Sequence, residues 1–307
     1  MRDLEHLQKQ TSILMNLYNS KRFEDAIQKG KILLKKYPDQ IIFYNAVSLS
    51  LSSVDKNEEA LNILKQALSL QPNNIYVLNN LGLINGKLNK ENLSREYYEK
   101  ALTINSNFID TLVNLGNLEL NEKKPDKAEH YLKKALSLSR AKETDELIYM
   151  ALGNYNQQIG NFGEAINNFK MINKINKNNT GADKSISLIH KYLKKDDPHL
   201  LSMETKLTDS SNNQDLKALY FALGKAYEDI KDYKKSFNCL QAGNRIADKE
   251  FNYNINNDKA LFDEIKDLFK NYEYKNTITS DKKIIFIVGM PRSGTTLTEQ
   301  ILSNHKD

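Results

Sequence analysis

The chain has too few cysteines to form a disulfide, because Cys239 is the only one among 307 residues. Cys239 falls in a segment expected to be helical, so we interpret it as a small core residue rather than a reactive thiol. The five histidines show no spacing typical of metal ligands, either with one another or with Cys239. We therefore expect no metal site and no redox chemistry.

Long apolar runs are also missing. No segment approaches the roughly 20 apolar residues that span a bilayer, and residues 1–6 lack the features of a signal peptide. We expect a cytoplasmic protein without a membrane partner. The net charge of +5 is spread over lysine pairs along the chain. This pattern is typical of solvated helix faces and does not predict a nucleic-acid-binding stripe.

What the chain does have is a repeat. The small residues Ala26, Ala60, Ser94 and Ala128 follow one another at intervals of 34, and Ala165 follows after 37, which predicts an insertion near 141–143. Further positions keep this phase, namely Leu81-Gly82, Leu115-Gly116, Leu152-Gly153, Leu33, Ala67, Ala101 and Ala135. Together they resemble the tetratricopeptide (TPR) helix-turn-helix repeat over about 170 residues.

The chain departs from the TPR pattern in places. Leu14 and Ser48 stand where the consensus has glycine, and terminal repeats are commonly atypical. A further unit, marked by Leu223-Gly224 and Ser236, appears only after a gap. The segment 256–272 then reads as one more amphipathic helix, which we expect to seal the end of the array.

Residues 284–297 predict a buried strand that runs into a phosphate-binding loop. Gly289 and Gly294 are five positions apart, and Thr295 opens a helix whose N-terminus favours an anion. The spacing matches the loop of nucleoside triphosphatases, but Thr295 replaces the lysine that reaches the outer phosphates, which disfavours an ATPase or GTPase. Arg292 is the only cation of the loop, and its guanidinium suits bidentate contact with phosphate or sulfonate oxygens.

The string Val288-Gly289-Met290-Pro291-Arg292-Ser293-Gly294-Thr295-Thr296-Leu297 resembles the 5'-phosphosulfate loop of sulfotransferases, in the form found in tyrosylprotein sulfotransferases and their bacterial relatives. The order of repeat array, helix and loop resembles bacterial TPR-sulfotransferase proteins along the whole chain. The resemblance implies sulfuryl transfer from 3'-phosphoadenosine 5'-phosphosulfate (PAPS) to a hydroxyl acceptor such as protein tyrosine, without a metal. It also implies that the 5'-phosphosulfate is held by Arg292, Ser293, Gly294, Thr295 and Thr296.

We therefore predict a mainly α protein, in which a TPR superhelix of helical hairpins precedes the first strand, loop and helix of a P-loop α/β sulfotransferase domain. The expected boundaries are 1–178 for an array of about five repeats, 179–213 for a degenerate repeat and linker, 214–247 for a further repeat, 248–281 for a capping helix and linker, and 282–307 for the incomplete sulfotransferase domain.

Two functions stay open. One strand, one loop and one helix cannot complete a nucleotide-binding domain, and the resemblance places the general base and the 3'-phosphate site beyond Asp307. In the first interpretation the chain is the leading part of a PAPS-dependent sulfotransferase, truncated shortly after the loop and inactive alone. In the second it is a non-catalytic TPR scaffold that binds a protein partner.

Asparagines indicate where such a partner would bind. Asn80 and Asn114 occupy equivalent positions of consecutive first helices, with Asn79 and Asn117 nearby, where TPR proteins line their concave face. Each amide offers donors and an acceptor, so a ladder of amides can hydrogen-bond an extended peptide backbone. The alternative is chance placement, because asparagine is abundant throughout the chain. The candidate peptide groove is Asn80, Asn114 and Asn117.

Overall fold

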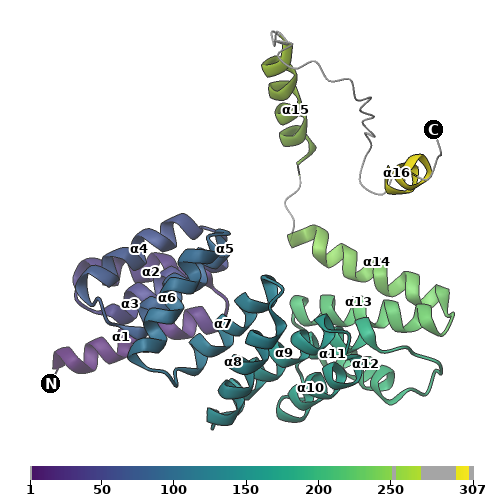
Figure 1. Ribbon diagram of the computed structural model, residues 1–307, viewed down its shortest axis with the longest axis horizontal. Coiled ribbons are helices and arrows are strands. Elements are labelled where there is room, and N and C mark those ends of the chain that lie inside the picture. The colour runs from purple at the N-terminus through teal and green to yellow at the C-terminus, as the bar shows by residue number, and fades with distance from the viewer. Residues whose placement is uncertain (1, 251–253, 271–294, 304–307) are drawn as a thin grey trace. The chain divides into compact units, whose positions relative to one another are not determined.

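The computed structural model describes residues 2–250, 254–270 and 295–303, and all regular secondary structure in these ranges is helical. Contacts divide the chain into unit 1 (Met1–Phe251) and unit 2 (Asn252–Asp307). The helices of unit 1 (Figure 1) are α1 (Arg2–Asn19), α2 (Phe23–Lys36), α3 (Ile41–Ser53), α4 (Asn57–Leu70), α5 (Ile75–Lys87), α6 (Glu91–Ile104), α7 (Ile109–Asn121), α8 (Pro125–Leu138), α9 (Lys142–Gln158), α10 (Phe162–Ile175), α11 (Thr180–Ile189), α12 (Pro198–Asp209), α13 (Asn213–Asp229) and α14 (Tyr233–Glu250).

Most helices of unit 1 pair as hairpins, and neighbouring hairpins stack, as α1/α2 on α3/α4 and α5/α6 on α7/α8. The short turn inside each hairpin contains one residue in the left-handed backbone region. These residues recur with the period of the sequence and are Lys21, Asp55, Asn89, Lys123, Gly160 and Lys231. The predicted array of helical hairpins is therefore confirmed.

Close approach of the two helices in a hairpin depends on a small residue in the first helix. A Cβ placed on Gly153 of α9 would lie 2.2 Å from the ring of Phe169 in α10, and one on Gly116 of α7 would lie 2.8 Å from Leu132 in α8. Phe169 and Leu132 are fully buried. The large side chain of the second helix thus occupies the space that the glycine leaves free.

The first hairpin reverses this arrangement. Leu14 stands where glycine was expected, and it is 1% exposed. The small residue lies instead on α2, where a Cβ added to Gly30 would meet Leu14 at 3.6 Å and Val47 at 2.2 Å. The exchange of large and small residues preserves the packing, so the departure of Leu14 from the repeat pattern has a structural compensation.

The predicted insertion lengthens a helix. α9 has 17 residues, whereas α3, α5 and α7 have 13 each. The additional residues add a turn to α9 at its N-terminal end, where the insertion was expected. The helical hairpin is kept, and the equivalent positions of later repeats, such as Ala165, follow three residues further along the sequence.

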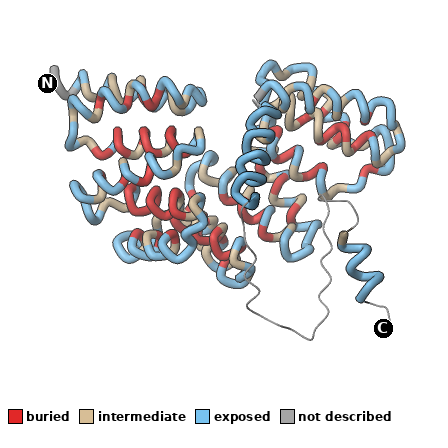
Figure 2. The backbone as a smooth tube through the Cα atoms, turned by 90° about the horizontal axis from the view of Figure 1, so that it is seen from above, coloured by how far each residue is buried: buried red, intermediate tan, exposed pale blue. Residues whose placement is uncertain are grey.

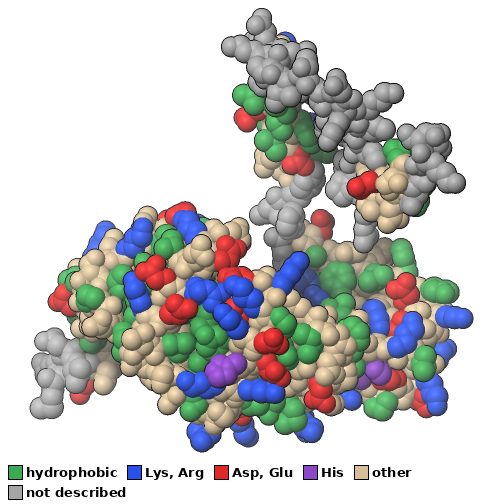
Figure 3. All heavy atoms as spheres, viewed as in Figure 1, with side chains coloured by type: hydrophobic (Ala, Val, Ile, Leu, Met, Phe, Trp, Pro, Cys, Tyr) green, Lys and Arg blue, Asp and Glu red, His purple; other side chains and the backbone are tan. Residues whose placement is uncertain are grey.

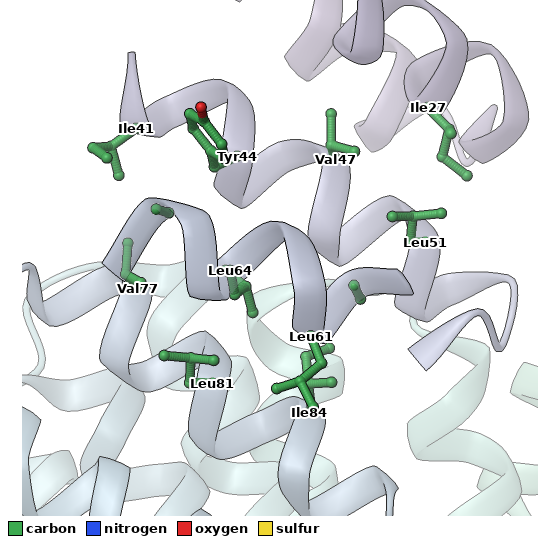
Figure 4. Close-up of a cluster of buried hydrophobic side chains, with 12 residues drawn as sticks. Ile27, Ile41, Tyr44, Val47, Leu51, Leu61, Leu64, Val77, Leu81 and Ile84 are labelled. Atoms are coloured by element: carbon green, nitrogen blue, oxygen red, sulfur yellow. The ribbon is translucent and has the colours of Figure 1, made fainter. Parts of the chain in front are cut away.

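The core follows the stacked helices. Figure 2 shows buried residues on the sides where helices meet and exposed residues on the outer sides. In Figure 4, Ile27 of α2 lies near Leu51 of α3, and Leu64 and Leu81 belong to the same cluster of buried apolar side chains from α4 and α5. Apolar burial of this kind is the main source of stability in a stacked array.

The array curves enough to bring distant segments together. Lys21, in the turn between α1 and α2, donates a hydrogen bond from Nζ to Oε1 of Gln214 at the start of α13, with a distance of 2.5 Å. The two residues are 193 positions apart in the sequence. This contact links the first hairpin of unit 1 to the last.

The pair α11 and α12 departs from the hairpin pattern. α11 packs against α10 and α13, and α12 packs against α13. Polar side chains join α11 to α12: the fully buried Asp183 accepts hydrogen bonds from Nε2 of His199 (3.2 Å) and from Nζ of Lys206 (2.6 Å). The hydroxyl of Tyr192 donates to Nδ1 of His199 (2.6 Å), and Asn173 of α10 also donates to Asp183 (2.7 Å).

Three carboxyls stabilise this part of unit 1 in their charged form. Burial alone would raise the pKa of Asp183, but hydrogen bonds from His199 and Lys206 lower it below its usual value. The pKa values of Asp197 and Asp229 are likewise lowered against burial, by His190 in the first case and by Lys191 and Lys225 in the second.

Cys239 lies partly buried beside the core formed by α12 and α13, and this burial raises the pKa of its thiol. The structure thus supports its interpretation as a core residue. None of the helices in the described ranges is long and apolar enough to cross a membrane.

Unit 2 contains α15 (Ile255–Lys270) and α16 (Thr295–Ser303) in its described part. α15 covers most of the helix predicted at 256–272, and none of its residues is buried. The predicted strand at 284–288 and the loop as far as Gly294 lie outside the described residues.

We expect Gly153→Ala to lower the free energy of unfolding by about 1–3 kcal/mol, because the added methyl group would press on the buried ring of Phe169. Gly163→Ala in the same hairpin is the matched control, because nothing lies within 4 Å of its added Cβ and helix propensity favours alanine. Urea unfolding followed by circular dichroism measures both. Equal midpoints for the two variants would contradict this role of Gly153.

We expect Asp183→Asn to destabilise unit 1 by about 3–5 kcal/mol near neutral pH, because it removes the fully buried charge that pairs with the half-buried Lys206. The folded-state pKa of Asp183 is lowered, so its contribution is complete above the unfolded-state pKa of about 3.9 and is lost as the pH falls through the folded-state pKa. The variant should therefore lose less stability than wild type in acid. Exposed Asp248→Asn is the control, and parallel acid dependences for Asp183→Asn and wild type would exclude the proposed stabilisation.

Candidate functional site

A groove runs along the first helices of the hairpins. It has a volume of about 530 Å³ and receives side chains from α1, α3, α5, α7 and α9. We call it the central groove. Its asparagines are Asn79, Asn114, Asn117 and Asn154, and its main apolar residues are Leu49, Leu83, Ile109, Val113, Leu147 and Met150. Such a mixture of apolar surface and a few polar groups is typical of binding sites.

The repeat explains why these residues meet. Asn117 and Asn154 are 37 positions apart, which is the interval between the equivalent residues Ala128 and Ala165. Leu49, Leu83 and Asn117 follow one another at intervals of 34. Equivalent residues of stacked hairpins lie on the same face, so the groove is the face on which corresponding positions of the first helices are aligned.

Side-chain amides connect three of these helices. Nδ2 of Asn114 on α7 donates to Oδ1 of Asn79 on α5 at 3.0 Å, and Thr111 donates to the same oxygen at 3.0 Å. Nδ2 of Asn79 donates to Asn80 at 3.4 Å, and Nδ2 of Asn80 donates to Oδ1 of Asn45 on α3 at 3.0 Å. We call this series, from Asn114 to Asn45, the amide chain.

The amide chain determines which groups remain for a ligand. Asn79 and Asn80 are each 7% exposed, and their amides are occupied with neighbouring side chains. Asn114 uses its N–H in the chain, which leaves its Oδ1 as an acceptor. Within the described part of unit 1, the amides of Asn117 and Asn154 make no hydrogen bond, so both retain donors and acceptors.

The structure separates the three asparagines that the sequence grouped together. Asn114 and Asn117 line the central groove. Asn80 is nearly buried and contributes to the contact between α5 and α3. The sequence prediction did not include Asn154, although its position 37 residues after Asn117 was a usable signal.

One charged residue lines the described groove, and it is Asp110 in the first turn of α7. Its side chain is open to solvent, yet neighbouring groove residues displace part of its water, and this desolvation raises the pKa of the carboxyl. No described side chain pairs with it. Elsewhere on unit 1, over the face that Figure 3 shows, positive and negative side chains intermix.

The candidate phosphosulfate residues are only partly described. Arg292, Ser293 and Gly294 lie outside the described residues. Thr295 and Thr296 are the first two residues of α16, where the loop motif predicts a helix to begin.

Two family models match parts of this chain, one in the repeats and one at the C-terminal end. A family model described as tetratricopeptide repeat matches residues 42–74, 75–108, 109–142 and 218–249. These ranges coincide with α3/α4, α5/α6, α7/α8 and most of α13/α14. A second model, described as sulfotransferase family, matches residues 285–307.

Similar proteins show the fold. An uncharacterized protein of Aquifex aeolicus (strain VF5) is 39% identical over 88 residues, which cover 28% of this chain and 12% of that relative. The solved structure of a thermophilic TPR protein from Thermus thermophilus has a TM-score of 0.55 at 17% identity and covers 59% of this chain and 97% of its own. A TPR protein from Parabacteroides merdae ATCC 43184 has a TM-score of 0.53 at 17% identity, covering 86% and 98%.

Proposed function

We propose that this TPR repeat protein binds an extended peptide segment of a partner protein in its central groove. The observation that carries the proposal is the pair of unoccupied amides, Asn117 and Asn154, at equivalent positions of neighbouring hairpins. An extended backbone presents N–H and C=O groups along its length, and each free amide can bond both kinds of group.

The amide chain makes this site rigid. Asn114 and Asn79 are held by hydrogen bonds across α7 and α5, so the groove does not need to order them when a ligand binds. Preorganisation lowers the entropic cost of binding. The apolar residues Leu83, Val113 and Met150 supply surface between the polar groups, which suits a peptide with apolar side chains.

The contacts of some asparagines differ from what chance placement in an asparagine-rich chain would give. Asn80 behaves as chance placement predicts, because its amide serves the contact between helices. Asn117 and Asn154 differ, since their amides stay free within a groove. A polar side chain with no structural partner in a groove favours a binding role over a packing role.

We expect Asn117→Ala with Asn154→Ala to weaken binding of a groove ligand by about 5- to 150-fold, because each of the two lost hydrogen bonds is worth about 0.5–1.5 kcal/mol. The ligand is obtained by selecting phage-displayed random peptides on the intact protein, and its dissociation constant is measured by fluorescence anisotropy. Asn62→Ala is the control, since Asn62 is exposed on α4 and does not line the groove. Equal affinity for the double variant and wild type would place peptide binding elsewhere.

A second function rests on the C-terminal motif. We infer that the chain contributes the phosphosulfate loop of a PAPS-dependent sulfotransferase, supported by the family-model match over 285–307 and by the start of α16 at Thr295. PAPS, when bound, supplies the sulfuryl group. Arg292, Ser293, Gly294, Thr295 and Thr296 would hold its 5'-phosphosulfate, with the guanidinium of Arg292 balancing negative charge.

The two proposals are compatible. Sulfuryl transfer requires little covalent chemistry from the protein, so positioning of the acceptor contributes much of the rate. A groove that binds an extended peptide is one means of holding an acceptor hydroxyl. Protein tyrosine is then the acceptor class that agrees best with both the groove and the motif, whereas a TPR scaffold without catalysis requires the groove alone.

We expect the intact protein to bind 3'-phosphoadenosine 5'-phosphate, and Arg292→Ala to weaken that binding by about 1.5–3 kcal/mol, as for hydrogen bonds to charged groups. Isothermal titration calorimetry measures the affinity. Arg140→Ala is the control, because Arg140 lies between α8 and α9 in unit 1. Unchanged affinity for Arg292→Ala would remove this residue from the nucleotide site.

A further inference from the structure

The lining of the central groove has one charge and no opposite charge to balance it. Among the described residues of the lining, Asp110 is the one charged side chain, and the lining contains no lysine, arginine or histidine. By contrast, the buried acidic residues Glu119 and Asp183 of unit 1 pair with Arg95 and Lys206. The ligand is therefore the natural source of a charge that balances Asp110.

Residues equivalent to Asp110 in the neighbouring repeats are apolar and exposed. They are Ile42 (43% exposed), Tyr76 (57%) and Leu147 (61%), which differ from Asp110 by the repeat intervals. Leu147 lines the groove together with Asp110, and Met150 lies one helical turn beyond Leu147. A carboxylate thus interrupts a row of exposed apolar residues at a single position.

Surroundings of this kind match a long cationic side chain. Lysine and arginine place an aliphatic stem on apolar surface and keep the charged head at a polar group. Asp110 has no cationic partner among the groove residues, and partial desolvation raises the pKa of its carboxyl. A cationic head would stabilise the charged carboxylate, whereas an acidic peptide would add repulsion.

We propose that the central groove selects peptides that carry a lysine or arginine, with the cationic head at Asp110 and the aliphatic stem on Leu147 and Met150. This inference rests on the proposed peptide binding and specifies the chemistry of the partner. The free amides of Asn117 and Asn154 bind the backbone, while Asp110 reads one side chain. A salt-sensitive affinity follows from the charge pairing.

The test compares selections of phage-displayed random peptides on the intact wild-type protein and on Asp110→Asn. We expect lysine or arginine at one position of the wild-type peptides and loss of this preference with the variant. Asp126→Asn is the matched control, because Asp126 is the second residue of α8 as Asp110 is of α7, is exposed, and does not line the groove. It should retain the basic preference.

A double-mutant cycle then assigns the contact. In a resynthesised peptide, norleucine replaces lysine, or citrulline replaces arginine, so that the aliphatic stem is kept and the charge removed. Each single change, in the peptide or at Asp110, should weaken binding about tenfold, and the two together should cost little more than one. Additive losses would show that the basic side chain binds elsewhere and would overturn the inference.

Failure of the inference and failure of the proposed function give different results. Neutral or acidic peptides that depend on Asn117 and Asn154 but tolerate Asp110→Asn would overturn the basic preference and leave peptide binding in place. Absence of any peptide selected above background would overturn both proposals.

Discussion

The close approach of the two helices in each hairpin is the constraint on which the rest of unit 1 depends. A glycine on the first helix, as at Gly116 or Gly153, accepts a large buried side chain from the second helix. Because this close contact recurs with the repeat, successive hairpins stack in register and the first helices align on one face. The central groove is a product of this alignment. The reversed pair Leu14 and Gly30 shows that the constraint applies to the pair of residues and not to glycine at one position.

Register also divides the asparagines between packing and binding. Asn80 and Asn45 are 35 residues apart, as are Asn114 and Asn79, so each pair bridges neighbouring first helices. Amides that meet a partner of this kind fix the spacing between helices and are lost to a ligand. Asn117 meets none, and it remains able to bond a ligand. The repeat therefore aligns the asparagines along the groove, but only those without a partner on a neighbouring helix, such as Asn117, keep an amide free for a ligand.

The sequence period was sufficient to predict the hairpins, the insertion before α9 and the face on which a groove would form, because all three depend on local spacing. It was not sufficient to rank Asn80 against Asn79. These neighbours differ by about 100° around a helix, and the packing of α5 against α3 decides that Asn80 meets Asn45 while Asn79 lines the groove. The α11–α12 segment was predicted only as a degenerate repeat, because Asp183 and Lys206 meet through tertiary packing and leave no periodic signal. The lysines in left-handed turns, such as Lys123, were also missed, since that position favours glycine or asparagine.

The proposed groove would bind a peptide through its backbone and through one charged side chain, which limits how selective it can be as an acceptor site for sulfuryl transfer. The proposed hydrogen bonds from Asn117 and Asn154 to backbone groups do not depend on side-chain identity, so they would allow many peptides to bind. Asp110 adds one criterion, and the apolar residues around it add a weak preference for shape. Such a site binds a class of segments and not a single sequence. In the proposed sulfotransferase the two parts would have separate tasks: the array would increase the local concentration of suitable segments, and the loop at Arg292 would hold the phosphosulfate that reacts with them. Specificity for the acceptor atom must then arise close to the phosphosulfate, since the groove has no group that distinguishes one hydroxyl from another.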